Sequence, residues 1–151
     1  MKNIKEFACY YPKTAKVIVR VNTWWLRTEA AEAFELMRNA YQALFPGLKF
    51  LINSAGRTHD QQIAIYKEKP GLAAKPGSSW HESGQAVDVS AVIMKAQSGW
   101  TQEQFEQFAL KYGFHRTVIR EPWHWEFHTE KLPRNNKALK EGIAYIGNNH
   151  S

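Results

Sequence analysis

The order of apolar and polar positions along the chain predicts a succession of short helices and strands. A helix is expected over residues 28–45, because apolar side chains recur there at intervals of three and four: Ala30, Ala33, Phe34, Met37, Tyr41 and Leu44. Thr28 is the expected N-cap of this helix, and Pro46-Gly47 is expected to end it.

The remaining patterned segments predict further strands and two shorter helices. Polar residues alternate with branched or aromatic ones in the segments 16–21, 48–54, 85–92, 115–120 and 123–128, which are expected to be strands. The last two are expected to form an antiparallel pair joined through Glu121-Pro122. Helices are expected at 58–68 and 101–111, the second with a Thr101/Gln104 capping box. Two Pro-Gly pairs predict a loop at 69–79.

Together these elements predict an α+β fold with a mostly antiparallel central sheet and flanking helices. The connections between them are short, which disfavours parallel strands. The chain has 151 residues, of which 44% are hydrophobic, and this is enough to bury a core. We therefore expect a single domain over residues 1–151, and a monomer.

The charge balance is basic, with 20 Lys and Arg against 14 Asp and Glu and a formal net charge of +6. Such a surface favours anionic partners: nucleic acid, anionic lipid or an acidic wall polymer. The basic residues are spread along the chain without a long run, so a solvated basic surface and a polyanion groove both remain open. No nucleic-acid motif accompanies the charge, and we expect no nucleic-acid partner.

Cysteine usage and hydropathy exclude other classes. The lone cysteine, Cys9, allows no internal disulfide, and we expect it to be a small buried residue. No apolar run approaches the roughly 20 residues of a membrane span. The first residues, MKNIKEFACYYPK, lack the continuous apolar core of a signal peptide.

Two segments carry the candidate chemistry. The first, SSWHESGQAVDVS at residues 78–90, contains His81 and Asp88. On a straight strand these two would lie roughly 23 Å apart, so they can share a metal ion only if the chain turns between them. Glu82-Ser83-Gly84 can supply that turn, since glycine adopts backbone conformations that other residues resist.

The second segment, EPWHWEFH, occupies residues 121–128. Alternation along a strand places Trp123, Trp125 and Phe127 on one face, which is expected to pack on the core. His124, Glu126 and His128 then share the other face. His128 is expected to be solvent-exposed, with a contact to a metal ligand as the alternative.

His81, Asp88 and His124 together offer nitrogen and oxygen ligands without a thiolate. Three protein ligands and an open position are typical of catalytic zinc, although other divalent ions are not excluded. Glu121 is a nearby carboxylate outside the ligand set, suited to accept a proton from a metal-activated water. The spacing alone leaves an ordinary alternative open: packed histidines and a surface aspartate.

At these residues the chain resembles the zinc D-Ala-D-Ala carboxypeptidase and dipeptidase family, whose vancomycin-resistance members include VanY and VanX. The family motif S-x-H-x-x-G-x-A-x-D is filled by residues 79–88, and the motif E-x-x-H by residues 121–124. A weaker match is an arginine after a strand followed five residues later by a glutamine, here Arg57 and Gln62. The resemblance covers roughly residues 50–128 and implies a hedgehog-type zinc peptidase fold.

The resemblance also implies a role for each matching residue. His81, Asp88 and His124 would bind one Zn²⁺ ion, with Glu121 as general base and then acid. Arg57 would stabilise charge on the attacked carbonyl or hold the substrate, the alternative being a surface arginine paired with Asp60 or Glu68. Ser79 and Gln62 would belong to the substrate pocket.

The implied function is hydrolysis of peptidoglycan stem peptides, in the cell envelope. Glu-Pro-Trp-His is typical of VanY-type D,D-carboxypeptidases, which remove a terminal D-alanine. The alternatives are an L-Ala-D-Glu or other peptidoglycan endopeptidase of the endolysin type, and a non-catalytic zinc-containing binding module of the same fold. The loop 69–79, with Lys69 and Lys75, is expected to rim the pocket. Trp80 either packs or contacts substrate, and packing is the expectation.

Overall fold

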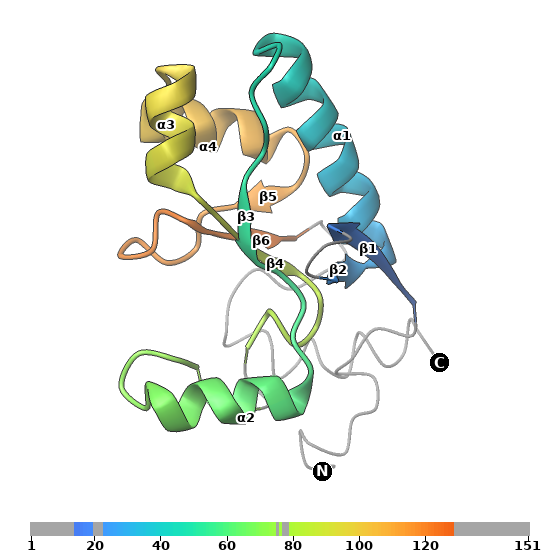
Figure 1. Cartoon of the computed structure of the whole chain (residues 1–151), viewed down its shortest axis with the longest axis vertical. Helices are drawn as coiled ribbons and strands as arrows, with labels where there is room; N and C mark the ends of the chain where they lie inside the picture. Colours follow the sequence, from blue (N-terminus) through green and yellow to red (C-terminus); the bar gives the residue numbers. More distant parts are fainter. Residues whose placement is uncertain (1–13, 20–22, 75, 77–78, 129–151) are drawn as a thin grey trace.

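The computed structural model describes residues 14–19, 23–74, 76 and 79–128 (Figure 1). Cys9 and Lys75 lie outside the described residues. The elements in chain order are β1 (Ala15–Val19), β2 (Trp24–Arg27), α1 (Thr28–Leu44), β3 (Ile52–Ser54), α2 (His59–Glu68), β4 (Ala86–Val89), α3 (Ala91–Ser98), α4 (Gln102–Leu110), β5 (Phe114–His115) and β6 (His124–Phe127).

The main sheet has the strand order β3-β4-β6-β5, and each neighbouring pair is antiparallel. A separate antiparallel ribbon is formed by β1 and β2. In the view of Figure 1 the sheet crosses the middle of the molecule, with α1, α3 and α4 above it and α2 below. This arrangement confirms the expected α+β class with a mostly antiparallel sheet and flanking helices.

Aromatic side chains fill the core between the sheet and the upper helices. Phe34 of α1 packs edge to face on Phe50, with the ring centroids 5.3 Å apart. Phe105 of α4 packs on Trp125 of β6, with the ring centroids 5.0 Å apart. Such pairs contribute about 0.5–1.5 kcal/mol each beyond the area they bury. The buried face of α1 consists of Ala30, Ala31, Phe34, Met37 and Tyr41, which largely confirms the expected stripe. Its last member, Leu44, is 57% exposed.

Several local expectations are wrong, among them the strand expected at 48–54, which begins only at Ile52. Thr28 is the first helical residue of α1 and not its cap; its hydroxyl donates to Thr14 Oγ1 at 2.7 Å. The strand expected at 85–92 ends at Val89, because Ser90 begins the turn into α3. The strand expected at 115–120 is limited to β5, since the chain turns where Glu121 N donates to Val118 O at 3.0 Å.

The ribbon β1–β2 supports the two segments that carry the candidate site. Gly56 N donates to Trp25 O at 2.7 Å, and Arg27 N donates to Gly84 O at 3.0 Å. A Cβ atom at Gly56 would lie 2.4 Å from the Trp25 ring, so only glycine permits this approach. Strand β2, which the hydrophobic pattern does not predict, therefore braces the chain on both sides of the site.

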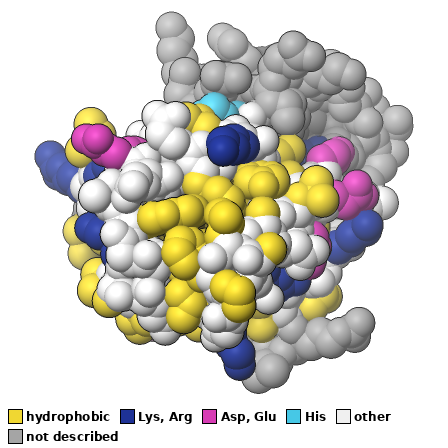
Figure 2. Space-filling view, turned by 90° about the horizontal axis from the view of Figure 1, so that it is seen from above, with side chains coloured by type: hydrophobic (Ala, Val, Ile, Leu, Met, Phe, Trp, Pro, Cys, Tyr) yellow, Lys and Arg dark blue, Asp and Glu magenta, His cyan; other side chains and the backbone are white. Residues whose placement is uncertain are grey.

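The end of the molecule formed by the upper helices carries exposed apolar side chains. Figure 2 shows hydrophobic atoms gathered among polar ones on this face. Exposed large apolar residues of α1, α3 and α4 include Leu44, Val92, Ile93 and Leu110. Within the described part of the chain, none of the helices has the length and apolarity needed to cross a membrane.

Candidate active site

A tight turn brings His81 back toward β4. Glu82 N donates to Ser79 O at 3.0 Å, Gly84 N to His81 O at 3.2 Å, and Gln85 N to Trp80 O at 3.0 Å. Gly84 has a φ of +71°, in the left-handed region that favours glycine. The turn expected between His81 and Asp88 is therefore confirmed.

The ring of His81 is fixed by the carbonyl group of Ala55. The two are joined by a hydrogen bond of 2.6 Å from Nδ1 to Ala55 O, so Nδ1 carries the proton. In the neutral ring Nε2 then carries no proton, and it lies 3.3 Å from Asp88 Oδ1. The backbone adds a further tie, since Arg57 N donates to His81 O at 2.9 Å. Ser79 Oγ accepts from His81 N at 3.2 Å, and Ser79 is 5% exposed.

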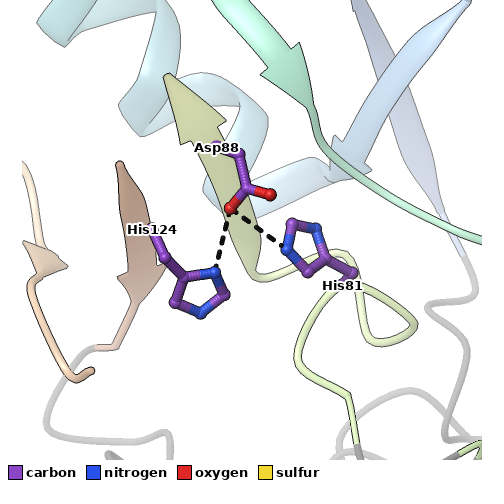
Figure 3. A group of neighbouring side chains, drawn as sticks. All are labelled: His81, Asp88 and His124. Atoms are coloured by element: carbon purple, nitrogen blue, oxygen red, sulfur yellow. Dashed lines mark hydrogen bonds and ion pairs between the residues drawn. The ribbon is translucent and has the colours of Figure 1, made fainter. Parts of the chain in front are cut away.

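Asp88 and His124 are directly opposite each other on β4 and β6. Asp88 Oδ1 lies 3.0 Å from His124 Nδ1, so one carboxylate oxygen faces both imidazoles (Figure 3). One ligand atom from each of the three residues lies within 4.8 Å of the other two. Ligands held about 2.0–2.2 Å from a tetrahedral metal lie roughly 3.3–3.6 Å apart. The distances from Asp88 Oδ1 to His81 Nε2 and His124 Nδ1, 3.3 and 3.0 Å, are close to this spacing.

The electrostatics of these three groups suit metal binding. Burial lowers the pKa of His81, which favours the neutral imidazole that can bind a cation. Burial alone would raise the pKa of Asp88, but His81 and His124 hold it well below its usual range. Burial likewise opposes charge on His124, but hydrogen bonds to Asp88 and Glu126 raise its pKa to about 9. A metal ion must therefore displace a proton from His124.

Arg57 lies beside this cluster, held by neutral and acidic groups. Its Nη2 donates to Ser54 Oγ at 3.0 Å and lies 3.6 Å from Asp88 Oδ2, while Nη1 donates to Gln62 Oε1 at 3.2 Å. Gln62 is fully buried, and its Nε2 donates to Ala74 O at 2.8 Å. Burial lowers the pKa of the Arg57 guanidinium, and Asp88, Glu121 and Glu82 oppose this.

In the described part of the chain, neither Asp60 nor Glu68 forms an ion pair with Arg57. The alternative of a surface arginine paired with one of these acids is therefore not what the structure shows. Arg57 lies instead in the lining of a cleft of about 980 Å³, together with the three candidate metal ligands.

Two loops complete the lining of this cleft. The loop after α2 contributes Lys69 and Leu72, as expected for the rim, and the turn before β6 contributes Ile119, Arg120 and Glu121. Backbone hydrogen bonds fix the turn, because His124 N donates to Glu121 O at 3.0 Å. Glu121 thus lies in the cleft lining outside the ligand set, and its charge acts to raise the pKa of Arg57.

The structure corrects two expectations for β6. His128 is expected from the sequence to be solvent-exposed, but it is 1% exposed, and its Nε2 lies 2.8 Å from Glu126 Oε1. Trp123, expected in the core, is 42% exposed and lines the cleft, because β6 begins only at His124. Trp80 is 3% exposed and packs edge-on against the His128 ring at 4.6 Å, as expected for a packing residue.

Comparison with known proteins agrees with this geometry. The family model described as VanY, D-alanyl-D-alanine carboxypeptidase, matches residues 23–130. The chain belongs to the VanY family. This match confirms the resemblance seen in the motifs and extends it upstream to include β2 and α1.

Two curated relatives support the VanY assignment. A D-alanyl-D-alanine carboxypeptidase of Enterococcus faecium is 31% identical over 138 residues, which cover 81% of this chain and 45% of that protein. The putative carboxypeptidase YodJ of Bacillus subtilis (strain 168) is 27% identical and covers 81% of this chain and 55% of its own length. The chain thus spans about half the length of these relatives.

Solved structures share the VanY-type fold at low sequence identity. The LD-carboxypeptidase LdcB has a TM-score of 0.63 at 22% identity, covering 93% of this chain and 75% of its own. VanYB in complex with D-alanine-D-alanine has a TM-score of 0.62 at 20% identity, covering 89% of this chain and 84% of that chain. A mutant of a VanY D,D-pentapeptidase in complex with Zn(II) has a TM-score of 0.58 at 19% identity, covering 89% of this chain and 85% of that chain.

Proposed function

We propose that this chain is a zinc-dependent D,D-carboxypeptidase that removes a terminal D-alanine from peptidoglycan stem peptides in the cell envelope. The observation that supports this most strongly is the convergence of three ligand atoms from His81, Asp88 and His124 in a cleft that Glu121 and Arg57 also line. Membership of the VanY family supports the reaction class, and the Zn(II) complex of a related structure supports the choice of metal.

The donor set suits one zinc ion, since it combines two imidazole nitrogens with a carboxylate oxygen. Zinc bound there would acidify a water molecule and polarise the carbonyl group of the peptide. Glu121 accepts a proton from the attacking water and donates it to the amine that leaves. Its place in the cleft lining, outside the ligand set, suits a group that exchanges protons with substrate.

Arg57 is proposed to hold negative charge on the substrate. Ser54, Gln62 and Asp88 fix its guanidinium, so it needs little reorganisation as charge develops on the attacked carbonyl group. Its alternative partner is the terminal carboxylate of the peptide, which a guanidinium binds well. Lys69 and Arg120 in the same lining add positive charge, which favours a substrate that carries carboxylates.

Ser79 and Gln62 remain the proposed pocket residues. Both line the cleft, but both are buried and hydrogen-bonded to the protein. Ser79 accepts from the backbone of the ligand His81, and Gln62 links Arg57 to the loop after α2. Their contribution to substrate binding is therefore proposed to be the shape of the pocket wall.

The decisive experiment is digestion of purified muropeptides by the zinc-loaded chain, with the products identified by mass. Loss of one alanine from pentapeptides that end in D-Ala-D-Ala supports a D,D-carboxypeptidase. Loss of the last residue from tetrapeptides indicates an L,D-carboxypeptidase, and cleavage within the stem indicates an endopeptidase. Muropeptides that stay uncleaved by a fully zinc-loaded chain would favour the non-catalytic binding module over either kind of peptidase.

Two variants tie the reaction to the site. Glu121→Gln keeps the size of the side chain but removes its basicity, and we expect activity to fall by about 10²–10⁴-fold with zinc content unchanged. His81→Ala removes a ligand and is expected to lose zinc. Full activity of the first variant, or full zinc occupancy of the second, would overturn the assigned roles.

A further inference from the structure

A chain of hydrogen bonds runs along β6 away from His124. His124 Nε2 lies 2.7 Å from Glu126 Oε2, and Glu126 Oε1 lies 2.8 Å from His128 Nε2. The three residues are two positions apart, so their side chains share one face of the strand. The family motifs include neither Glu126 nor His128, and the proposed reaction gives them no role.

The hydrogen-bond partners of its two ring nitrogens determine the orientation and the tautomer of the His124 imidazole. Its Nδ1 faces Asp88 and the other candidate ligand atoms, while its Nε2 faces the Glu126 carboxylate. A neutral imidazole has one bare nitrogen and one N–H group. An N–H group at Nε2, donated to Glu126, leaves Nδ1 bare, and this is the form that can bind a metal ion. Carboxylates placed in this way orient ligand histidines and make them more basic.

Glu126 is built into its position. It is 3% exposed, and it accepts hydrogen bonds from His124, His128 and the side chain of Thr117. A buried carboxylate is costly unless such donors surround it. With three donors, the Glu126 side chain has little freedom to rotate away from His124.

His128 anchors this carboxylate to the rest of the site. Its backbone N donates to Gly113 O at 2.9 Å, and its ring packs edge-on against Trp80 at 4.6 Å. Trp80 immediately precedes the candidate ligand His81. The hydrogen-bonded row that begins on β6 thus contacts Trp80, the chain neighbour of the other candidate histidine ligand.

We infer that Glu126 and His128 are positioning residues of the metal centre: Glu126 holds the His124 ring with Nδ1 toward the metal ion, and His128 holds Glu126. The inference rests on the proposed zinc site, but it concerns residues that the family motifs do not include. Loss of such a support typically weakens metal binding by about 10–100-fold. A pair that merely fills the core would leave the metal affinity of the folded protein unchanged.

The test measures metal affinity apart from peptidase activity. Purified wild type and variants are stripped with a chelator and titrated with Zn²⁺ against a competing fluorescent chelator. The absorption bands of bound Co²⁺ then report the coordination geometry. Glu126→Gln has nearly the shape of the native residue but carries no charge and is a weaker acceptor. We expect it to bind Zn²⁺ about 10–100-fold more weakly and to shift the Co²⁺ bands.

Glu82→Gln is the matched control. Glu82 is also a fully buried carboxylate near the site, but it lies 3.1 Å from the ring of His59, which is not a candidate metal ligand. Both variants remove one buried negative charge, and only Glu126→Gln changes a partner of His124. Equal weakening in the two variants would assign the effect to net charge and overturn the inference.

Two variants of His128 test the second part. His128→Gln keeps a donor near the position of Nε2, whereas His128→Phe removes it. We expect His128→Phe to weaken Zn²⁺ binding and to alter the Co²⁺ bands, with His128→Gln close to wild type. If His128→Phe does not fold, judged by circular dichroism, the Glu126→Gln result still decides the inference.

The outcomes separate this inference from the proposed function. A wild-type chain that binds neither Zn²⁺ nor Co²⁺ contradicts the proposed metal site itself. A wild type that binds tightly, together with a Glu126→Gln variant of unchanged affinity and unchanged Co²⁺ bands, contradicts only the positioning role.

Discussion

Asp88 and His124 face each other directly across β4 and β6, with Asp88 Oδ1 3.0 Å from His124 Nδ1. Both atoms belong to the candidate metal site. Without a metal ion, a proton on His124 holds the two groups together, because the hydrogen bonds to Asp88 and Glu126 raise the pKa of His124 to about 9 despite its burial. The proton and the metal ion therefore compete for one nitrogen atom.

This competition predicts that zinc uptake releases a proton. At pH 6, His124 of the metal-free chain is protonated and Asp88 is already ionised, while burial lowers the pKa of His81 and so favours its neutral form. A zinc-bound water has a pKa near 7 and stays largely protonated at that pH. We expect close to one proton per zinc ion, measured by titration calorimetry in buffers of different ionisation enthalpy.

The same measurement contains its own check. Between pH 6 and pH 9 the number of protons that zinc displaces from His124 should fall, because a growing fraction of His124 is already neutral. The apparent zinc affinity should rise over the same range. Zinc binding at pH 6 without any proton release would show that His124 is neutral in the metal-free chain, contrary to its hydrogen bonds with two carboxylates.

The stability of the metal-free chain should also depend on pH. The pKa of His124 rises from 6.5 to about 9 on folding, so its contribution is complete below pH 6.5 and is lost as the pH rises through 9. The pKa of Glu126 falls from 4.5 to about 2, because hydrogen bonds from His124 and His128 outweigh its burial. Its contribution is present above pH 4.5 and is lost toward pH 2.

Urea unfolding in the presence of a chelator should therefore find the greatest stability between about pH 4.5 and 6.5. The loss from His124 alone on going to high pH is on the order of 3 kcal/mol. The control is His124→Gln, which cannot titrate and should show a smaller alkaline loss. An equal alkaline loss in both proteins would exclude His124 as its cause.

Much of the site could be predicted because it depends on short-range geometry. The distance that an extended chain would impose between His81 and Asp88 requires a turn, and Gly84 at φ +71° provides it. Alternation along β6 predicts that His124, Glu126 and His128 share a face. It does not predict whether another segment covers that face, and Trp80 covers His128.

The elements that the sequence pattern misses have similar causes. Strand β2 contacts the site segments through Gly56 and Gly84, and a pattern within one segment contains no information about such distant contacts. Helix α3 directly follows β4, and apolar residues recur from Ala86 to Met94, interrupted only by Asp88 and Ser90. Periodicity does not distinguish a strand from a short helix in such a run, so the strand is expected to extend too far.

The contact between Gly84 and β2 predicts a large effect of a single methyl group. In Gly84→Ala the new Cβ would lie 2.6 Å from Arg27 N, a backbone atom that the β1–β2 ribbon holds in place. The left-handed backbone alone costs about 1–2 kcal/mol for alanine. We expect a total loss of more than about 3 kcal/mol in the free energy of unfolding, because the contact also requires the ribbon to shift.

Gly99→Ala is the matched control for this prediction. Gly99 has a φ of +74°, but a Cβ there would have no atom within 4 Å. The free energy of unfolding of Gly99→Ala should therefore fall only by the backbone cost of about 1–2 kcal/mol. Equal losses in the two variants, measured by urea unfolding, would mean that β2 does not press on the turn that carries His81.

Gln62 offers a test of how Arg57 is held. Gln62→Ala removes both the acceptor for Arg57 Nη1 and the donor to Ala74 O, whereas Gln62→Glu keeps an acceptor and loses the donor. If Arg57 must be fixed for catalysis, Gln62→Ala should lower kcat/KM by about 10–100-fold, with zinc content unchanged. Gln62→Glu should then retain more activity than Gln62→Ala.

The control for Gln62 is Glu68→Ala on the same helix. Glu68 is exposed and forms no ion pair with Arg57 in the described part of the chain, so kcat/KM should stay within about twofold of wild type. A larger loss in Glu68→Ala than in Gln62→Ala would revive the surface pairing of Arg57. If both Gln62 variants lose activity equally, the bond to Ala74 O matters more than the bond to Arg57. Gln62 would then act through the loop after α2, which contributes Lys69 and Leu72 to the cleft.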